Sequence, residues 1–207
     1  MNFHITLARL RVALTQTLPG AEAQALMAPR LRGEWPPSFD PARVRHAAGL
    51  VLLFPIDEGA HIALTVRSKT LGRHSGQVSL PGGVAEPGET FEQAALREAH
   101  EEVALAPSRV RVLGALTPLD IPVSGFRLHP IVGAMTQRPA LRPSGEVAQI
   151  LEVSVAELID QSSKVSITRV RSGQELTVPA FRIAGTEIWG ATAMVIAELL
   201  VLLGWKP

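Results

Sequence analysis

The chain contains no cysteine among its 207 residues. Disulfide bonds and thiol chemistry are therefore excluded, and the composition is compatible with a reducing compartment, so we expect a cytoplasmic protein. The sequence also lacks any strong excess of charge, because its formal net charge is only +1. Since no run of basic residues accompanies this charge, we expect no nucleic-acid partner.

Long hydrophobic runs are absent as well. The most apolar stretch, residues 191–203, contains Glu198 and is too short to cross a bilayer, so we interpret it as a buried helix. The N-terminus has no apolar core of the signal-peptide type. We expect no membrane partner, and with 46% apolar residues the chain can bury the core of a single domain without covalent staples.

The order of the predicted elements starts with helices. Apolar residues recur at helical spacing over residues 3–18, and a shorter helix is predicted over residues 21–28. Residues 1–46 are therefore interpreted as N-terminal helices and a linker packed on the core, and residues 47–207 as the main part of one domain. In that part, strands are predicted at residues 49–54, 61–67, 109–117, 127–135, 146–148, 175–183 and 186–189, and helices at residues 91–104, 155–160 and 191–203.

One stretch, residues 82–105, combines a glycine-containing loop with a helix that carries acidic residues. Thr90 and Gln93 have the spacing of a capping box, which predicts the start of this helix. A similar pair, Ser154 and Glu157, predicts the start of the helix over residues 155–160. A loop near the site is expected between the two strands that follow the acidic helix, over residues 118–125.

Three glutamates, Glu98, Glu101 and Glu102, fall on one face of the predicted helix, within a stripe that begins and ends apolar. Like charges at this spacing repel each other by a few tenths of a kcal/mol per pair. A cation is therefore expected there, and carboxylate oxygens suit hard divalent ions such as Mg²⁺ or Mn²⁺. The alternative is an ordinary solvated acidic face.

The spacing of polar and glycine residues favours the metal site. Five residues separate Gly83 from Glu89, and seven more lead to Arg97-Glu98-x-x-Glu101-Glu102. This pattern resembles the signature of the Nudix hydrolases, which cleave nucleoside diphosphates linked to another group. This resemblance implies an α/β fold, an α/β/α sandwich with a mixed β-sheet, here with N-terminal accessory helices. Ala104 stands where the family usually has glycine, and alanine can serve there if the backbone stays right-handed.

The segment before the loop resembles one branch of the family, the coenzyme A diphosphatases. It reads Leu64-Thr65-x-Arg67-Ser68, then Arg73 and His74, and runs through Gly76-x-Val78 into Pro81-Gly82-Gly83. Two positions depart from the branch, with Gly72 at the usual arginine and Leu80 at the usual phenylalanine. The substrate implied is the small molecule coenzyme A or an acyl derivative, cut to 3′,5′-ADP and a 4′-phosphopantetheine product.

The resemblance also assigns roles to residues. Glu98 and Glu102, assisted by Glu101, would hold Mg²⁺ or Mn²⁺ together with a main-chain carbonyl of Gly82 or Gly83. Arg97 would orient a carboxylate, with Glu89 as its partner. Glu146 would be a further metal ligand or the base for the attacking water, and the alternative is a solvated glutamate at a strand start.

Arg67, Ser68, Arg73 and His74 would bind the phosphates of the 3′-phospho-ADP half, because guanidinium groups grip phosphate bidentately. The alternative for the two arginines is that they are ordinary exposed cations. Two rival functions remain open: a Nudix enzyme for another nucleoside diphosphate derivative, such as ADP-ribose or NADH, and a non-catalytic binding module of the same fold. A homodimer is possible, although no stretch of the sequence identifies an interface.

Overall fold

The computed structural model describes residues 1–30, 35–68, 76–171 and 174–206. Its α-helices are α1 (Phe3–Ala13), α2 (Gly20–Ala25), α3 (Phe91–Val103), α4 (Val155–Ile159) and α5 (Gly190–Leu202). Its strands are β1 (Arg45–Ile56), β2 (Gly59–Arg67), β3 (Val78–Ser79), β4 (Gly82–Val84), β5 (Arg111–Ala115), β6 (Leu119–Ile121), β7 (Phe126–Ala134), β8 (Val147–Ser154), β9 (Lys164–Arg171), β10 (Gln174–Ile183) and β11 (Thr186–Trp189).

An eight-stranded mixed sheet forms the centre of the molecule. Its main path runs β3-β2-β1-β7-β5, while β4 pairs with β1, β6 pairs with β7 and β8 pairs with β2. The pairing of β1 with β7 is parallel, and the other pairings in this sheet are antiparallel. The long strand β1 is thus bonded to β2, β4 and β7, and these contacts decide where the loop after β3 lies.

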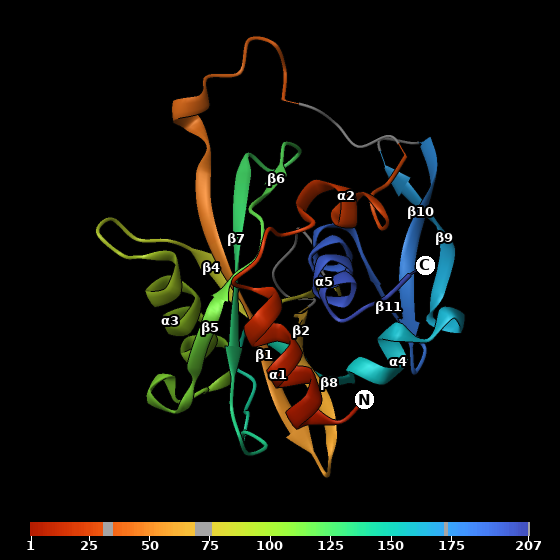
Figure 1. The fold of residues 1–207 in the computed structure, drawn as a ribbon. Coiled ribbons are helices and arrows are strands. Elements are labelled where there is room, and N and C mark those ends of the chain that lie inside the picture. The colour runs from red at the N-terminus through yellow and green to blue at the C-terminus, as the bar shows by residue number, and fades with distance from the viewer. Residues whose placement is uncertain (31–34, 69–75, 172–173, 207) are drawn as a thin grey trace.

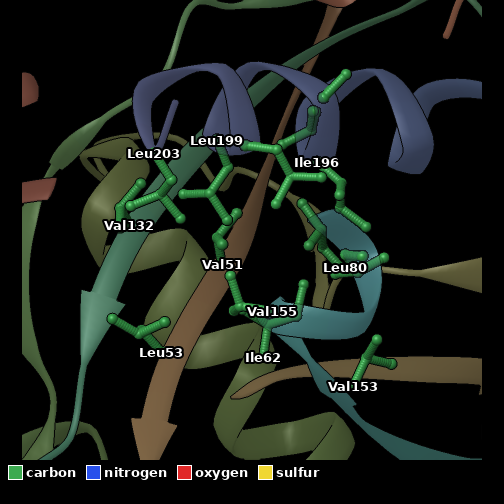
Figure 2. Close-up of a cluster of buried hydrophobic side chains, with 14 of the residues drawn as sticks. Val51, Leu53, Ile62, Leu80, Val132, Val153, Val155, Ile196, Leu199 and Leu203 are labelled. Carbon is green, nitrogen blue, oxygen red and sulfur yellow. The ribbon is translucent and has the colours of Figure 1, made fainter. Parts of the chain in front are cut away.

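Strand β1 is buried on both faces, which explains its continuous apolar sequence. Leu50 and Leu52 belong to the core under α3, whereas Val51 and Leu53 belong to the core under α5. Figure 1 shows α3 and α5 on opposite sides of this sheet, and Figure 2 shows Val51 and Leu53 in the α5-side core. The predicted α/β/α sandwich with a mixed sheet is therefore confirmed.

The N-terminal helices belong to the α5-side core. Phe3, Leu7 and Leu10 of α1 are buried in it, and α2 packs against α5. Helix α1 ends at Ala13 and not at residue 18, because the chain turns there: the Thr15 hydroxyl donates to the carbonyl of Val12 at 2.8 Å. None of the helices within the described ranges is long and apolar enough to cross a membrane.

A second, three-stranded antiparallel sheet, in the order β11-β10-β9, lies beside α4 and α5 (Figure 1). Strands β10 and β11 match the predicted strands, but the sequence analysis missed β9. It also missed β6, which lies within the predicted loop 118–125 because the chain turns back at once and pairs Leu119 with Leu128 and Ile121 with Phe126.

The predicted capping box at Ser154 is wrong. Ser154 does precede α4, but its side chain makes no capping hydrogen bond. Its backbone is still part of β8, where it pairs with His61 of β2. A residue that ends a strand and opens a helix of five residues is placed by the strand pairing, so the local signal did not decide its conformation.

Candidate active site

The loop that leads into the acidic helix is held against the sheet by β4. Gly82 and Gly83 pair with Gly49 and Ala48 of β1. A Cβ atom on Gly82 would lie only 2.2 Å from the carbonyl oxygen of Ala48, so no side chain fits there. The close approach of two backbones is thus the reason for glycine at this position.

Helix α3 begins at the predicted residue. The Thr90 hydroxyl accepts from the Gln93 N–H at 3.2 Å, and the Gln93 side chain accepts from the Thr90 N–H at 2.9 Å. The capping box is therefore confirmed. It fixes the helical register that carries the glutamates of the next two turns toward the glycine loop.

Glu98 lies directly against this loop. A Cβ atom on Gly83 would come within 2.4 Å of the Glu98 carboxyl carbon and of one of its oxygens. The missing side chain of Gly83 thus leaves the space that the Glu98 carboxylate occupies, and that side chain is only 18% exposed. The glycine loop and the helix are complementary in shape at the carboxylate where the sequence predicts a metal ligand.

Arg97 connects the loop with three carboxylates. Its guanidinium grips Glu89 with two hydrogen bonds of 2.8 and 3.1 Å, as predicted, and also donates to Glu98 at 2.9 Å and Glu101 at 3.3 Å. A further bond of 3.0 Å reaches the carbonyl of Val84, a contact that the sequence analysis missed. The Arg97 contact lowers the pKa of Glu89, and the carboxylates raise the pKa of Arg97.

Glu102 is half-buried, whereas Glu101 is exposed. Its carboxylate accepts from the backbone N–H of Gly82 at 3.1 Å. Burial, followed by repulsion from Glu98 and Glu146, raises the pKa of Glu102 to about 7, although the Gly82 bond and the charge of Arg67 act in the opposite direction. The dominant effect is the loss of water around a charge, so this carboxylate is poised to accept a cation or a proton.

The end of α3 differs from the expectation. Ala104 has φ 54° and ψ 29°, so its backbone is left-handed and not right-handed. This conformation is usual for a glycine that ends a helix and is strained for alanine. It turns the chain so that Leu105 becomes buried with only 2% exposure, and the burial of that side chain offsets the strain.

Glu146 reaches the site through the loop before β8. In this loop Arg142 and Ser144 donate backbone N–H groups to the carbonyls of Val103 and Glu102 at 3.0 and 2.9 Å. The carbonyl of Glu146 accepts from the N–H of Ser68 at 2.8 Å. The structure therefore brings Glu146 and the end of β2 beside the end of α3, which the sequence order alone did not establish.

The predicted site residues are not all equally placed. Glu101 is 56% exposed and contacts Arg97, whereas Glu98 is only 18% exposed and Glu102 is half-buried. Arg67 ends β2 close enough to influence the Glu102 carboxylate. Arg73 and His74, the other predicted phosphate-binding residues, lie outside the described residues.

The donor set fits a hard divalent ion. In the described ranges, no three His, Cys, Asp or Glu side chains already form a metal cage. However, Glu98 lies in the space left by Gly83, and Glu102 is a half-buried carboxylate whose charged neighbours are mainly acidic. Mg²⁺ and Mn²⁺ bind through one or two carboxylates and keep waters for substrate phosphates, so an incomplete cage is the arrangement they use.

Fold and site together define the class: an α/β protein whose mixed sheet carries a glycine loop and an acidic helix, with carboxylates that suit a hard divalent ion. Residues 44–171 match the family model of the NUDIX domain. Similar proteins include an uncharacterised Nudix hydrolase, NudL, of Pectobacterium atrosepticum, 33% identical over 180 residues, which are 86% of this chain and 93% of the relative. NudL of Photorhabdus laumondii is 40% identical over 159 residues, 75% and 83% of the two chains.

The fold is also similar to a solved structure. The crystal structure of RenU, a Nudix hydrolase from M. smegmatis, aligns with a TM-score of 0.55 at 21% identity and covers 79% of this chain and 88% of its own. The chain belongs to the Nudix hydrolase family, and it is a hydrolase of phosphoanhydrides. Members of this family work with divalent metal ions and bind small nucleotide derivatives.

Proposed function

We propose that the protein hydrolyses the diphosphate of coenzyme A or of acyl-coenzyme A, giving 3′,5′-ADP and (acyl-)4′-phosphopantetheine. The observation that carries this proposal is the place of the Leu64-Thr65-x-Arg67-Ser68 strand end. Arg67 is near enough to Glu102 to lower the pKa of that carboxylate, and the N–H of Ser68 donates to the main-chain carbonyl of Glu146. The segment that resembles the coenzyme A branch thus adjoins the acidic residues at which cleavage is proposed.

The same strand end also forms the base of the next segment. The N–H of Arg67 donates to the carbonyl of Gln77 at 3.0 Å, and the N–H of Gly76 donates to the carbonyl of Arg67 at 3.1 Å. Ser68 and Gly76, the described residues that border the segment with Arg73 and His74, therefore lie beside the site. We propose that Arg73 and His74, with Arg67 and Ser68, bind the phosphates of the 3′-phospho-ADP half.

The roles of the acidic residues follow from their surroundings. Glu98, Glu102 and the more exposed Glu101 would hold Mg²⁺ or Mn²⁺, with a carbonyl of Gly82 or Gly83. When bound, such an ion neutralises the diphosphate and lowers the pKa of a water molecule. Arg97 keeps the Glu98 carboxylate oriented through its 2.9 Å bond.

The proton of the attacking water needs an acceptor, and we assign this role to Glu146, which is exposed beside Glu102. The water oxygen bonds to one phosphorus, the bond from that phosphorus to the bridging oxygen breaks, and the second phosphate leaves with that oxygen. The alternative role for Glu146, a further metal ligand, uses the same position.

A substrate panel tests this proposal. Coenzyme A, acetyl-coenzyme A, ADP-ribose and NADH are each incubated with the protein and Mg²⁺ or Mn²⁺, and the products are identified by mass. We expect 3′,5′-ADP from the two coenzyme A substrates, with coenzyme A turned over at least about tenfold better than ADP-ribose, as loss of specific phosphate contacts implies. Faster cleavage of ADP-ribose or NADH would refute the assignment of coenzyme A while leaving the hydrolase assignment intact.

A further inference from the structure

The loop of residues 138–146 is held at both of its ends. At its start, Arg138 forms an ion pair with Glu152 of β8, with a bond of 3.1 Å from Nε to Oε1. Toward its end, the N–H groups of Arg142 and Ser144 cover the carbonyls of Val103 and Glu102. Carbonyls in the last turn of a helix have no partner within the helix, so this loop supplies the missing donors.

Ser144 makes hydrogen bonds through its N–H, its carbonyl and its hydroxyl group. Its N–H donates to the carbonyl of Glu102 at 2.9 Å, and its own carbonyl accepts from the N–H of Val147 at 3.1 Å. Its hydroxyl oxygen accepts from the N–H of Glu146 at 3.4 Å. One residue thus joins the backbone of a glutamate on α3 to the backbone of the glutamate before β8.

Glu146 depends on such backbone contacts for its position. In the part of the chain that the structure describes, its carboxylate has no hydrogen-bond or ion-pair partner, and the residue is exposed. The nearby charge of Glu102 repels it. The N–H of Glu146 donates to the Ser144 hydroxyl on one side, and its carbonyl accepts from the N–H of Ser68 on the other. These bonds hold the residue close to the Glu102 carboxylate.

We propose that Ser144 is a positioning residue that holds Glu146 beside Glu102 at the reacting diphosphate. The inference rests on the role proposed above for Glu146, and it adds that the placement of this acid depends on a contact outside the signature of loop and acidic helix. Ser144 itself does not touch the substrate. Its hydroxyl acts through the backbone of Glu146, and its N–H acts through the end of α3.

The test is a double-mutant cycle of Ser144→Ala and Glu146→Gln, measured with the nucleoside diphosphate substrate that the wild-type protein cleaves best. Loss of the hydroxyl should lower kcat about 3- to 10-fold, the equivalent of one hydrogen bond, with KM changed less than about twofold. Ser144→Thr keeps the hydroxyl and should recover most of kcat. In the Glu146→Gln background, Ser144→Ala should have no further effect, because the residue that it positions no longer acts.

Ser162→Ala is the matched control, since Ser162 is also an exposed-turn serine, in the 3-10 helix Gln161–Ser163, and its side chain bonds locally, at 2.7 Å to Asp160. A readout without turnover accompanies the kinetics: amide hydrogen exchange over residues 144–147 should become faster in Ser144→Ala and stay unchanged in Ser162→Ala. An unchanged kcat in Ser144→Ala, or an equal fall in both backgrounds, would overturn the inference. Full activity of Glu146→Gln alone would refute the role of Glu146 and this inference with it, whatever the substrate panel shows.

Discussion

At the scale of single residues, removal of the Glu98 charge is the most direct test of the proposed metal site. Glu98→Gln keeps the size of the side chain that lies in the space left by Gly83 but removes its negative charge. We expect kcat to fall by on the order of 10²-fold or more, because the proposed site would lose a charged ligand of its metal. The melting temperature should change little, since Arg97 retains Glu89 and Glu101.

Glu92→Gln is the matched control for this experiment, because Glu92 is an exposed glutamate of the same helix, near its start. Its kcat should equal that of the wild type. Wild-type turnover by the Glu98→Gln protein would contradict the assignment of Glu98 as a metal ligand.

The strain at Ala104 predicts a stabilising substitution. Because a left-handed backbone costs alanine roughly 1 kcal/mol or more relative to glycine, Ala104→Gly should raise the free energy of unfolding by about 0.5–1 kcal/mol. This corresponds to an increase of about 1–4 °C in melting temperature for a domain of this size. The same change at exposed Ala8, in the middle of α1, should have the opposite sign and cost about 0.5–1 kcal/mol. Equal effects of the two substitutions on unfolding would refute strain at Ala104.

The raised pKa of Glu102 makes the stability of the metal-free protein depend on pH. The folded state holds the proton up to about pH 7, whereas a glutamate in the unfolded chain releases it near its ordinary pKa of 4.5. The unfolded state therefore binds fewer protons between these values, and the stability of the folded state falls as pH rises through this window. Thermal melts in EDTA at pH 5 and pH 7.5 should show a larger loss for the wild type than for Glu102→Gln.

Glu101→Gln serves as the control for these melts, because Glu101 is 56% exposed. This substitution should leave the pH dependence of the melting temperature as it is in the wild type. Added Mn²⁺ should raise the melting temperature of the wild type at pH 7.5 by mass action, and it should do so less for Glu102→Gln. The same pH dependence in wild type and Glu102→Gln would mean that Glu102 does not carry the raised pKa.

At the scale of elements, a buried polar cluster connects α2, α5 and the segment between β5 and β6. Glu198 of α5 is fully buried and accepts hydrogen bonds from Gln24 at 2.9 Å and from the Thr117 hydroxyl at 2.6 Å. Gln24→Ala would leave this carboxylate with one donor fewer. We expect a loss of about 1–3 kcal/mol in the free energy of unfolding, measured by urea denaturation.

Gln16→Ala, at an exposed glutamine between α1 and α2, should change the free energy of unfolding by less than about 0.5 kcal/mol. If both glutamine variants unfold at the same urea concentration as the wild type, the bond from Gln24 to Glu198 contributes nothing measurable to stability.

Elements that are specified by residues close in sequence were predicted, and elements that are specified by tertiary pairing were missed. Helix α3 was predicted from Thr90, Gln93 and the glycines before it, all of which act within a few residues. Strand β9 was missed because it is specified by its pairing with β10, a tertiary contact. For the same reason the site was predicted in part: its glutamates share one helix, but the approach of Glu146 requires the pairing of β2 with β8.

Ala104 shows the limit of local reasoning in the other direction. Alanine favours a right-handed backbone, so the residue itself did not predict the left-handed turn, although the glycine usual at this position in the family is typical of one. The conformation is imposed by the burial of Leu105 beyond it and by the loop whose Arg142 and Ser144 cover the end of α3. Both causes lie outside the residue itself, so only the assembled structure reveals the strain.

At the scale of the whole molecule, the N-terminal helices share the core of the rest of the domain. Leu10 of α1 is fully buried among residues of β1, β2 and α5. Leu10→Ala should therefore cost about 2–5 kcal/mol, as for a leucine in the centre of a core. Val12→Ala, at a position of the same helix that is 64% exposed, should cost less than about 0.5 kcal/mol. A small effect of Leu10→Ala on urea denaturation would show that α1 can separate from the domain.

The parallel pairing of β1 with β7 has a consequence for the speed of folding. Both strands are central, and the whole of β2, β4 and α3 lies between them in the chain. Their pairing requires the closure of a long loop. The chain loses conformational entropy in this closure before the stabilising contacts between the two strands form, which slows folding. Strand β4 pairs with β1, and α3 packs on β1 and β7. The acidic site is therefore expected to reach its final geometry only when β1 and β7 pair, late in folding. Recovery of metal-dependent activity during refolding should then follow the slow phase of sheet assembly, well after α3 has become helical.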